Sequence, residues 1–102
     1  MITRELLNPA SIVVVGGSNN LRKPGGRILQ NIMNGGYSGN LYVVNLKEEM
    51  VQGIPACHSA GDLPQVELAI LAIAAGNCPD VIRILTEQKN TKAFIILSAG
   101  FS

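Results

Sequence analysis

A short apolar run near the N-terminus, Ser11–Val15, constrains the fold more than any other segment. Residues 12–15 are all β-branched, and the pair Gly16-Gly17 follows them directly. An uninterrupted apolar run is typical of a strand that is buried on both faces, which is the usual state of strands in parallel sheets. The run therefore predicts a central strand, and the glycines predict a tight turn at its carboxyl end.

Apolar strands and amphipathic helices alternate along the rest of the chain. Apolar residues recur at helical spacing between residues 28 and 33, after Pro24 and before the stop signal Gly35-Gly36. Further strands are predicted at residues 41–45, 67–74 and 92–98, with a short irregular one at 51–56. This alternation predicts an α/β fold, a Rossmann-like parallel sheet with flanking helices, whose ligands sit beyond the carboxyl ends of the strands.

A second helix is expected after the strand at 67–74. Asn77 suits the N-cap position, Pro79 the first turn, and Asp80 the positive end of the helix dipole. The chain stops at Ser102, directly after the last predicted strand, so we expect a domain that is truncated at its C-terminus. Residues 1–102 form one domain in this reading.

Length and composition exclude several classes of protein. The 102 residues are 47% hydrophobic and 15% charged, with a net charge of +1, which argues against disorder and against a field that attracts nucleic acid or an anionic membrane. The longest apolar run, residues 68–75, is far shorter than the roughly 20 residues of a membrane-spanning helix. No signal-peptide pattern opens the chain, so we expect a cytoplasmic protein with no nucleic-acid or membrane partner.

The residues that most often carry metal or acid–base chemistry are sparse. Cys57 and Cys78 have neither CxxC spacing nor a second pair of ligands, so they indicate no metal site and no disulfide framework. His58 is the single histidine and has no carboxylate at catalytic spacing. We therefore predict no catalytic residue and no metal ligand.

The loop after the first strand has the composition of a phosphate-binding turn. Gly16, Gly17, Ser18, Asn19 and Asn20 lie between a strand and a helix start, where free N–H groups and the helix dipole favour an anion. The loop matches neither GxGxxG nor the P-loop, because no Ser or Thr follows its lysine. Glycines at this position also occur for steric reasons alone, so the loop by itself leaves both readings open.

Three cations beside this loop favour an anionic ligand. Arg22, Lys23 and Arg27 gather at the helix start, where acidic side chains are the usual choice. Lys23 is the first candidate for a phosphate contact. The alternative is that all three are solvated surface charges.

The end of the second predicted strand bears on the identity of the nucleotide. A domain that binds NAD usually has an acidic residue there for the adenine ribose, whereas this chain continues as Asn45-Leu46-Lys47. Lys47 suits a phosphate on that ribose, as in coenzyme A (CoA) or NADP. Glu48 and Glu49 keep the ribose-acid reading open if the strand ends a few residues later.

Two further segments follow predicted strands. Residues 72–77, which include Ala74, are small enough for a flat base or a thin arm to pass close to the backbone, although small residues also serve helix packing. Ser98 and Ala99 follow the last strand, and the Ser98 hydroxyl can donate a hydrogen bond.

Six short motifs follow one another along nearly the whole chain. They are Leu7-Asn8-Pro9, Val15-Gly16-Gly17-Ser18-Asn19-Asn20, Lys23-Pro24-Gly25-Gly26, Val44-Asn45-Leu46-Lys47-Glu48, Asp62-Leu63-Pro64 and Ser98-Ala99-Gly100-Phe101. Together they resemble the CoA-binding domain of the NDP-forming acyl-CoA synthetases. That superfamily includes the α subunit of succinyl-CoA synthetase and the ADP-forming acetate–CoA ligases.

The resemblance implies a Rossmann-like domain that binds CoA. It assigns phosphate contacts to Ser18, Asn19, Asn20 and Lys23, a nucleotide contact to Lys47, and contacts with the thiol-bearing arm to Ser98 and Ala99. With the loop glycines and the neighbouring strand ends, the expected cofactor-binding residues are Gly16, Gly17, Ser18, Asn19, Asn20, Lys23, Asn45, Lys47, Ala74, Ser98 and Ala99. The sequence departs from the family pattern at Leu46 and Ala74, where the family often has proline.

Complete enzymes of that superfamily convert an acid, CoA and a nucleoside triphosphate to acyl-CoA, nucleoside diphosphate and phosphate through a phosphohistidine. The resemblance places that histidine, and the ATP and magnesium site, in absent domains, so this fragment alone is expected to bind CoA and catalyse nothing. The resemblance implies that residues 1–102 are the N-terminal fragment of a larger enzyme. Its expected partners are later ligase or ATP-grasp domains, in the same protein or in a partner subunit. An unpaired edge strand can pair with a second copy of the chain, so an oligomer is one of the expected states.

Two alternatives to a ligase domain remain at this point. One is a CoA-binding regulatory module attached to a protein acetyltransferase. The other is an NAD- or NADP-binding oxidoreductase domain, which Asn45 and Lys47 disfavour.

Overall fold

The computed structural model describes residues 9–97, which form one six-stranded sheet with a helix on each face. The strands are β1 (Ser11–Val15), β2 (Asn40–Val44), β3 (Met50–Val51), β4 (Ile54–Cys57), β5 (Leu68–Leu71) and β6 (Ala93–Ile96). The α-helices are α2 (Pro24–Asn34) and α3 (Cys78–Gln88), and two 3-10 turns, η1 (Ala60–Asp62) and η2 (Ala75–Asn77), lie in the connections. The strand order is β3-β4-β2-β1-β5-β6.

β1 lies near the middle of the sheet and is buried along its whole length. It pairs in parallel with β2 on one side, where Val13 faces Tyr42, and with β5 on the other, where Val13 faces Ala69. Burial on both faces explains the uninterrupted apolar run, because each face of this strand contacts a separate core.

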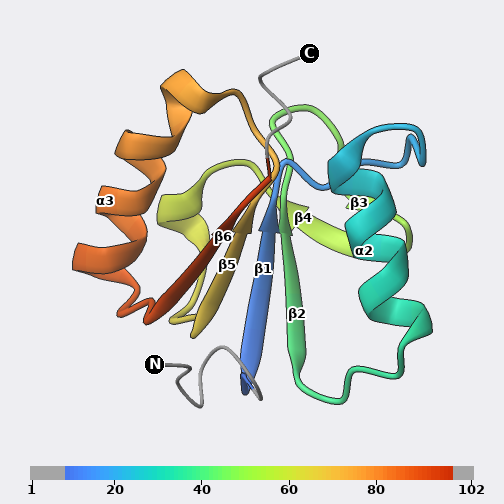
Figure 1. Cartoon of the computed structure of the whole chain (residues 1–102), viewed down its shortest axis with the longest axis horizontal. Helices are drawn as coiled ribbons and strands as arrows, with labels where there is room; N and C mark the ends of the chain where they lie inside the picture. The colour runs from blue at the N-terminus through green and yellow to red at the C-terminus, as the bar shows by residue number, and fades with distance from the viewer. Residues whose placement is uncertain (1–8, 98–102) are drawn as a thin grey trace.

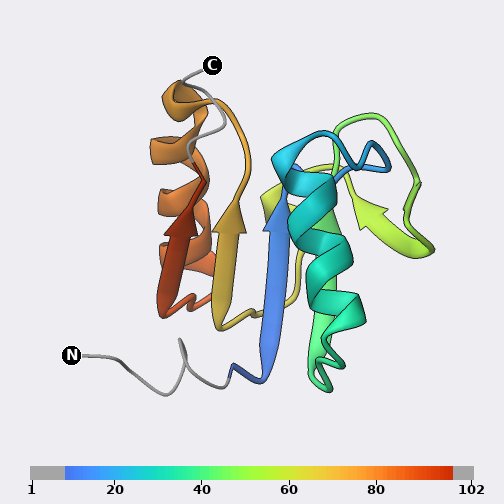
Figure 2. The same ribbon diagram turned by 45° about the vertical axis from the view of Figure 1, so that its right-hand side comes forward.

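The two α-helices cover opposite faces of the sheet (Figures 1 and 2). Leu29 of α2 is fully buried against Val14 and Val43. Leu85 of α3 is fully buried in the other cluster, with Val13 and Leu71. Consecutive residues of β1 thus belong to different cores, as the alternation of side chains along a strand requires.

The predicted irregular strand at 51–56 is in fact a small hairpin. β3 pairs antiparallel with β4 through the Val51–Ile54 pair, and β4 pairs in parallel with β2. The two turn residues, Gln52 and Gly53, have positive φ angles of 49° and 85°. The sheet is therefore parallel except at this edge, and the Rossmann-like prediction is confirmed.

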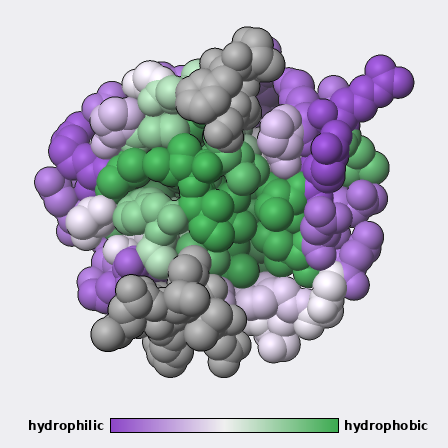
Figure 3. Space-filling model, in the orientation of Figure 1, coloured by the Kyte–Doolittle hydropathy of each residue, from purple (hydrophilic) through white to green (hydrophobic). Residues whose placement is uncertain are grey.

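β6 forms the opposite edge of the sheet, beside β5, and none of its residues is fully buried. Ile95 and Ile96 are 37% and 55% exposed. Figure 3 shows apolar side chains gathered over the sheet on the face that α2 covers only in part. Within residues 9–97, the backbone of β6 pairs only with β5.

Two local predictions need correction. The strand predicted at 67–74 is only Leu68–Leu71, because the chain leaves the sheet at Ala72 to enter η2. Asn77 stands at the N-cap of α3 but forms no side-chain capping bond, since η2 runs directly into the helix and gives Asn77 a helical backbone conformation. Among the described residues, no helix has the length and apolar character needed to cross a lipid bilayer.

Candidate functional site

The carboxyl ends of the parallel strands form the edge at which a ligand is expected. β1 and β5 are neighbours although β2, β3 and β4 lie between them in the sequence, so the winding of the chain reverses between them. In open α/β sheets the crevice beyond such a reversal is the usual ligand site. Two cavities lie at this edge, one against the start of α2 and the other against α3.

The first, here called the loop cavity, has a volume of about 380 Å³. It is lined by Gly16, Gly17, Ser18, Lys23, Pro24, Gly25, Asn45 and Ala72. Five of the expected site residues thus share one hollow: Gly16, Gly17, Ser18, Lys23 and Asn45. Ala72, which follows β5, lines the same cavity, whereas Ala74 does not.

Glycine is required in this loop for steric reasons. Gly16 has a φ of +89°, and a Cβ added there would collide with the carbonyl oxygen of Ala72. A Cβ on Gly25, in the first turn of α2, would collide with the carbonyl oxygen of Gly16. The helix start therefore sits directly on the end of β1, which brings its N-terminus to the floor of the loop cavity.

Several backbone donors at this cavity are unused. Within residues 9–97, no acceptor pairs with the backbone N–H of Ser18, Asn19 or Gly25. Lys23 occupies the N-cap of α2 and makes no side-chain capping bond. Free N–H groups at a helix start carry partial positive charge, so the loop presents donors suited to an anion.

The charges around the helix start have the same sign. The first turn of α2 contains no acidic residue. In the part of the chain that the structure describes, Arg22, Lys23 and Arg27 form no ion pair, and all three are exposed. Cations at a helix N-terminus are unfavourable unless an anion offsets them, so this corner is electrostatically prepared for a negative ligand.

The polar side chains of the loop are partly engaged within the protein. The Ser18 Oγ accepts from the Asn20 N–H at 2.9 Å, which leaves its hydroxyl hydrogen for another acceptor. The Asn20 Oδ1 accepts from the Arg22 N–H at 3.0 Å, which leaves its Nδ2 as a donor. Asn19 uses both ends of its amide on the β3–β4 hairpin, accepting from the Gln52 N–H at 2.7 Å and donating to the Met50 carbonyl at 3.1 Å. The Asn19 side chain is thus a structural element of the loop.

Asn45 connects the loop cavity to the turn that carries Lys47. Its Nδ2 donates to the Gly17 carbonyl at 2.9 Å, and its Oδ1 accepts from the N–H groups of Lys47 and Glu48, both at 2.8 Å. Lys47 is exposed on this turn and lines neither cavity. Glu48 and Glu49 are exposed as well.

The remaining expected residues lie apart from the loop cavity or outside the described chain. Ala74 is exposed at the start of η2, and the residue that lines the loop cavity from this segment is Ala72. Ser98 and Ala99 lie outside residues 9–97.

The second cavity, here called the apolar cavity, has a volume of about 360 Å³ and lies against α3. Its lining is Val15, Val44, Leu46, His58, Ser59, Ala60, Ile73, Asn77, Asp80, Val81 and Ile84. Leu46 lines this cavity while its side chain stays 82% exposed. An apolar hollow beside a polar anion site can hold a flat ring while its charged end contacts the loop.

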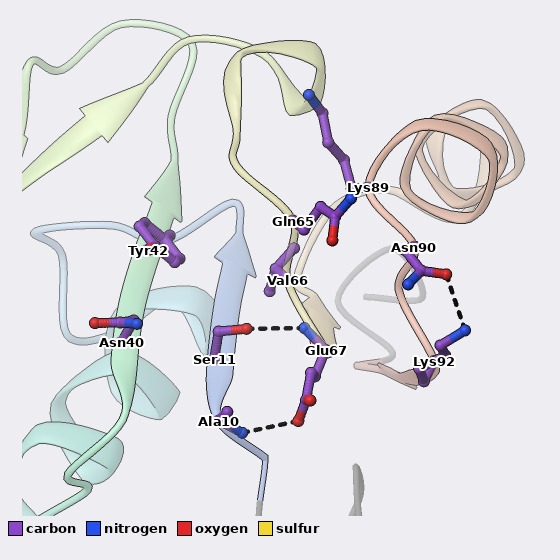
Figure 4. A pocket seen from close by; sticks show the side chains of 10 residues that line it. All are labelled: Ala10, Ser11, Asn40, Tyr42, Gln65, Val66, Glu67, Lys89, Asn90 and Lys92. Carbon is purple, nitrogen blue, oxygen red and sulfur yellow. Dashed lines mark hydrogen bonds between the residues drawn. The ribbon is translucent and has the colours of Figure 1, made fainter.

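A third cavity, of about 260 Å³, lies at the amino ends of the strands (Figure 4). There the Glu67 N–H donates to the Ser11 Oγ at 2.9 Å, and the Ala10 N–H donates to the Glu67 Oε1 at 2.9 Å. Lys92 is bonded to Asn90 at 2.8 Å, and the Lys89 side chain is directed away from Glu67. The two bonds of Glu67 join the beginning of β1 to the residue that precedes β5, whereas the bond between Lys92 and Asn90 is local.

Sequence reasoning missed Gln52, the residue that connects the hairpin to the loop. Its Nε2 donates to the carbonyl oxygens of Ser18 at 2.8 Å and Gly26 at 2.9 Å. The only local signal was the Gln-Gly pair at the hairpin turn. Within residues 9–97, no group of three or more His, Cys, Asp or Glu side chains is placed to hold a metal ion.

Comparison with known proteins identifies the family. A model of the family described as "CoA binding domain" matches residues 10–102. The ADP-forming acetate–CoA ligase II of Archaeoglobus fulgidus is 35% identical over 100 residues, which are 97% of this chain and 15% of the ligase. A trans-feruloyl-CoA synthase from an unknown prokaryotic organism is 36% identical over 98 residues, 95% of this chain and 14% of that enzyme.

A solved structure shows the same fold at similar identity. The crystal structure of PH0766 from Pyrococcus horikoshii OT3 superposes with a TM-score of 0.81 and 37% identity, over 93% of this chain and 22% of that one. The chain thus spans less than a quarter of the length of each of these relatives. It belongs to the CoA-binding domain family and is homologous to part of the ADP-forming acid–CoA ligases.

Proposed function

We propose that this chain binds coenzyme A at the carboxyl edge of its sheet, as one domain of an ADP- or NDP-forming acid–CoA ligase. The observation that carries the proposal is the loop cavity, where Lys23, unused N–H groups and a helix N-terminus converge with no acidic side chain in the first turn. Family membership supports CoA as the anion, because the two enzymes compared above share CoA in their names and differ in the acid.

In this proposal the diphosphate of CoA lies over the loop of residues 16–20. The N–H groups of Ser18, Asn19 and Gly25 donate to phosphate oxygens, together with the Ser18 hydroxyl and the Asn20 Nδ2. Lys23 offsets the phosphate charge through a charge-assisted bond. Gly16 and Gly17 allow the close approach of the backbone.

The adenine ring occupies the apolar cavity, with Leu46 and Ile73 on its walls. The turn fixed by Asn45 then brings Lys47 to the ribose, where its ammonium group meets the 3′-phosphate. The segment through Ala72 and Ala74, with Ser98 and Ala99, follows the thiol-bearing arm. No residue of this chain is assigned to bond making or breaking.

The larger ligase would supply the rest of the reaction. The acid, the nucleoside triphosphate and magnesium are assigned to other domains, in the same polypeptide or in a partner subunit. CoA bound here would be presented to those domains for acylation.

A calorimetric titration of the protein with CoA, dephospho-CoA, NADP and NAD tests the proposal. We expect CoA to bind most tightly, dephospho-CoA more weakly, and NAD least. A preference for NAD over CoA would overturn the proposed function. Equal binding of CoA and dephospho-CoA would remove only the role of Lys47.

A further inference from the structure

Gln52 occupies a turn position that does not suit its residue type. It has a φ of +49°, and with Gly53 it forms the two-residue connection between Val51 and Ile54. Such hairpin turns favour Asn-Gly or Gly-Gly, because a side chain at positive φ is strained. The turn itself therefore gives no reason for a glutamine.

The contacts of Gln52 supply that reason. Both hydrogens of its Nε2 are used, one on the Ser18 carbonyl at 2.8 Å and the other on the Gly26 carbonyl at 2.9 Å. Its backbone N–H donates to the Asn19 Oδ1 at 2.7 Å. One residue of the β3–β4 hairpin thus holds the loop at its beginning, through residues 18 and 19, and at the first turn of α2, through residue 26.

These bonds fix the orientation of the loop donors. In a trans peptide the carbonyl and the following N–H point in opposite directions. Holding the Ser18 carbonyl therefore sets the direction of the Asn19 N–H, which no acceptor in residues 9–97 uses. Gln52 itself does not line the loop cavity and carries no charge.

We propose that Gln52 is a positioning residue, which holds the loop of residues 18–26 in the form that receives a phosphate group. It acts through the backbone of Ser18 and Gly26 and does not touch the ligand. That the ligand is CoA rests on the proposed function. The effect of Gln52 on the order of the ligand-free loop does not depend on the proposed function.

The main variant is Gln52→Gly, because glycine adopts positive φ without strain and the hairpin turn is kept. Asn90→Gly is the matched control, since Asn90 is also an amide residue at positive φ, 55°, and its side chain is bonded to Lys92 at the amino ends of the strands. Urea unfolding of both variants gives the folded fraction, so that any loss of affinity is compared between equally folded proteins.

We expect Gln52→Gly to bind CoA about tenfold more weakly, because the ligand must then order the loop, whereas Asn90→Gly binds as the wild type does. We also expect faster amide hydrogen exchange at Asn20, Arg22 and Lys23 in the ligand-free Gln52→Gly protein, because the N–H groups of these residues are hydrogen-bonded within the loop. Gln52→Glu, which keeps the length but loses the two donors, should behave like Gln52→Gly.

A double-mutant cycle separates positioning from direct contact. If Gln52 acts through the loop, the double variant will raise the Kd for CoA by less than the product of the two single fold-changes, for Lys23→Ala and Gln52→Gly. The reason is that both substitutions damage the same organised site. A full product would show an independent contact with CoA and overturn the positioning role. Unchanged hydrogen exchange at Asn20, Arg22 and Lys23 would also overturn the positioning role, and that measurement stands even if the wild-type protein fails to bind CoA.

Discussion

The side-chain amide of Asn45 bridges the ends of β2 and β1, donating from Nδ2 to the Gly17 carbonyl oxygen at 2.9 Å. The same side chain accepts from the N–H groups of Lys47 and Glu48. One amide thus joins the loop cavity to the turn proposed to meet the ribose. A carboxylate could replace its acceptor role but not its donor role.

We therefore expect Asn45→Asp to weaken both the fold and the binding of CoA. The new carboxylate oxygen would face the Gly17 carbonyl without a hydrogen, which should lower the free energy of unfolding by about 1–3 kcal/mol. Its charge would also repel phosphate at the loop. Asn40→Asp is the control, because it adds the same charge at the other end of β2, where the Asn40 side chain is exposed. Equal effects of the two variants on the Kd for CoA would contradict this role of Asn45.

Lys23 should contribute more to CoA binding than any other lysine of the described chain. A charge-assisted bond to phosphate is worth roughly 1.5–3 kcal/mol, so Lys23→Ala should raise the Kd by about ten- to a hundredfold. Lys92→Ala, at the amino ends of the strands, removes the same charge far from the loop and should leave the Kd nearly unchanged. Calorimetry at two salt concentrations checks both, and an unaltered affinity for Lys23→Ala would remove this lysine from the site.

Lys47 should determine the preference for a phosphorylated ribose. Because it is exposed, we expect only a few-fold to about tenfold preference of the wild type for CoA over dephospho-CoA. Lys47→Ala should weaken the binding of CoA and leave the binding of dephospho-CoA unchanged. Glu48→Gln tests the competing ribose-acid reading, and a selective loss of dephospho-CoA or NAD binding in that variant would favour it.

Gly16 is expected to be the least replaceable glycine of the loop. Gly16→Ala combines a positive φ with a collision against the Ala72 carbonyl, whereas Gly36→Ala has a φ of +77° and open space around the new Cβ. Positive φ alone costs an alanine about 1–2 kcal/mol, which is the expected loss for Gly36→Ala. Gly16→Ala should lower the free energy of unfolding, measured with urea, by at least about twice as much as Gly36→Ala does. Similar losses would show that the loop yields easily at Ala72.

The sequence pattern predicted the parts of the fold that depend on periodicity. Ser11–Val15 had to be a central strand because only burial on both faces accounts for an unbroken apolar run. The site was predicted at the ends of such strands because parallel strands end at the same edge. The position of the loop cavity at Gly16, Ser18 and Lys23 agrees with that reasoning.

Contacts between loops had no such pattern. The bonds from Gln52 to Ser18 and Gly26 span 34 and 26 residues and depend on how two turns meet in space. The resemblance assigned a phosphate contact to Asn19, and nothing in the local sequence showed that its side chain is bonded to the hairpin, which leaves its backbone N–H for such a contact. The end of β5 was predicted at residue 74 instead of Leu71 because apolar residues continue beyond the true end of the strand and hide it.

Tyr37 should make the stability of the domain sensitive to alkaline pH. Its hydroxyl donates to the Pro9 carbonyl at 2.8 Å, and burial, with a smaller contribution from the charge of Glu67, raises the pKa of the phenol above its usual value near 10. Below pH 10 the phenol is protonated in both the folded and the unfolded chain, so its contribution is fully present there. As the pH rises from about 10 through the higher folded pKa, the unfolded chain releases the proton first and the contribution is lost.

The comparison with Tyr37→Phe isolates this effect from the titration of lysines. The variant lacks the hydroxyl, so it should be less stable than the wild type by about 0.5–1.5 kcal/mol at about pH 8. That difference should shrink as the pH approaches about 11, because only the wild type loses stability through the phenol. Urea unfolding of both proteins across this range measures it, and a difference that stays constant with pH would show that the phenol titrates alike in the folded and unfolded chains.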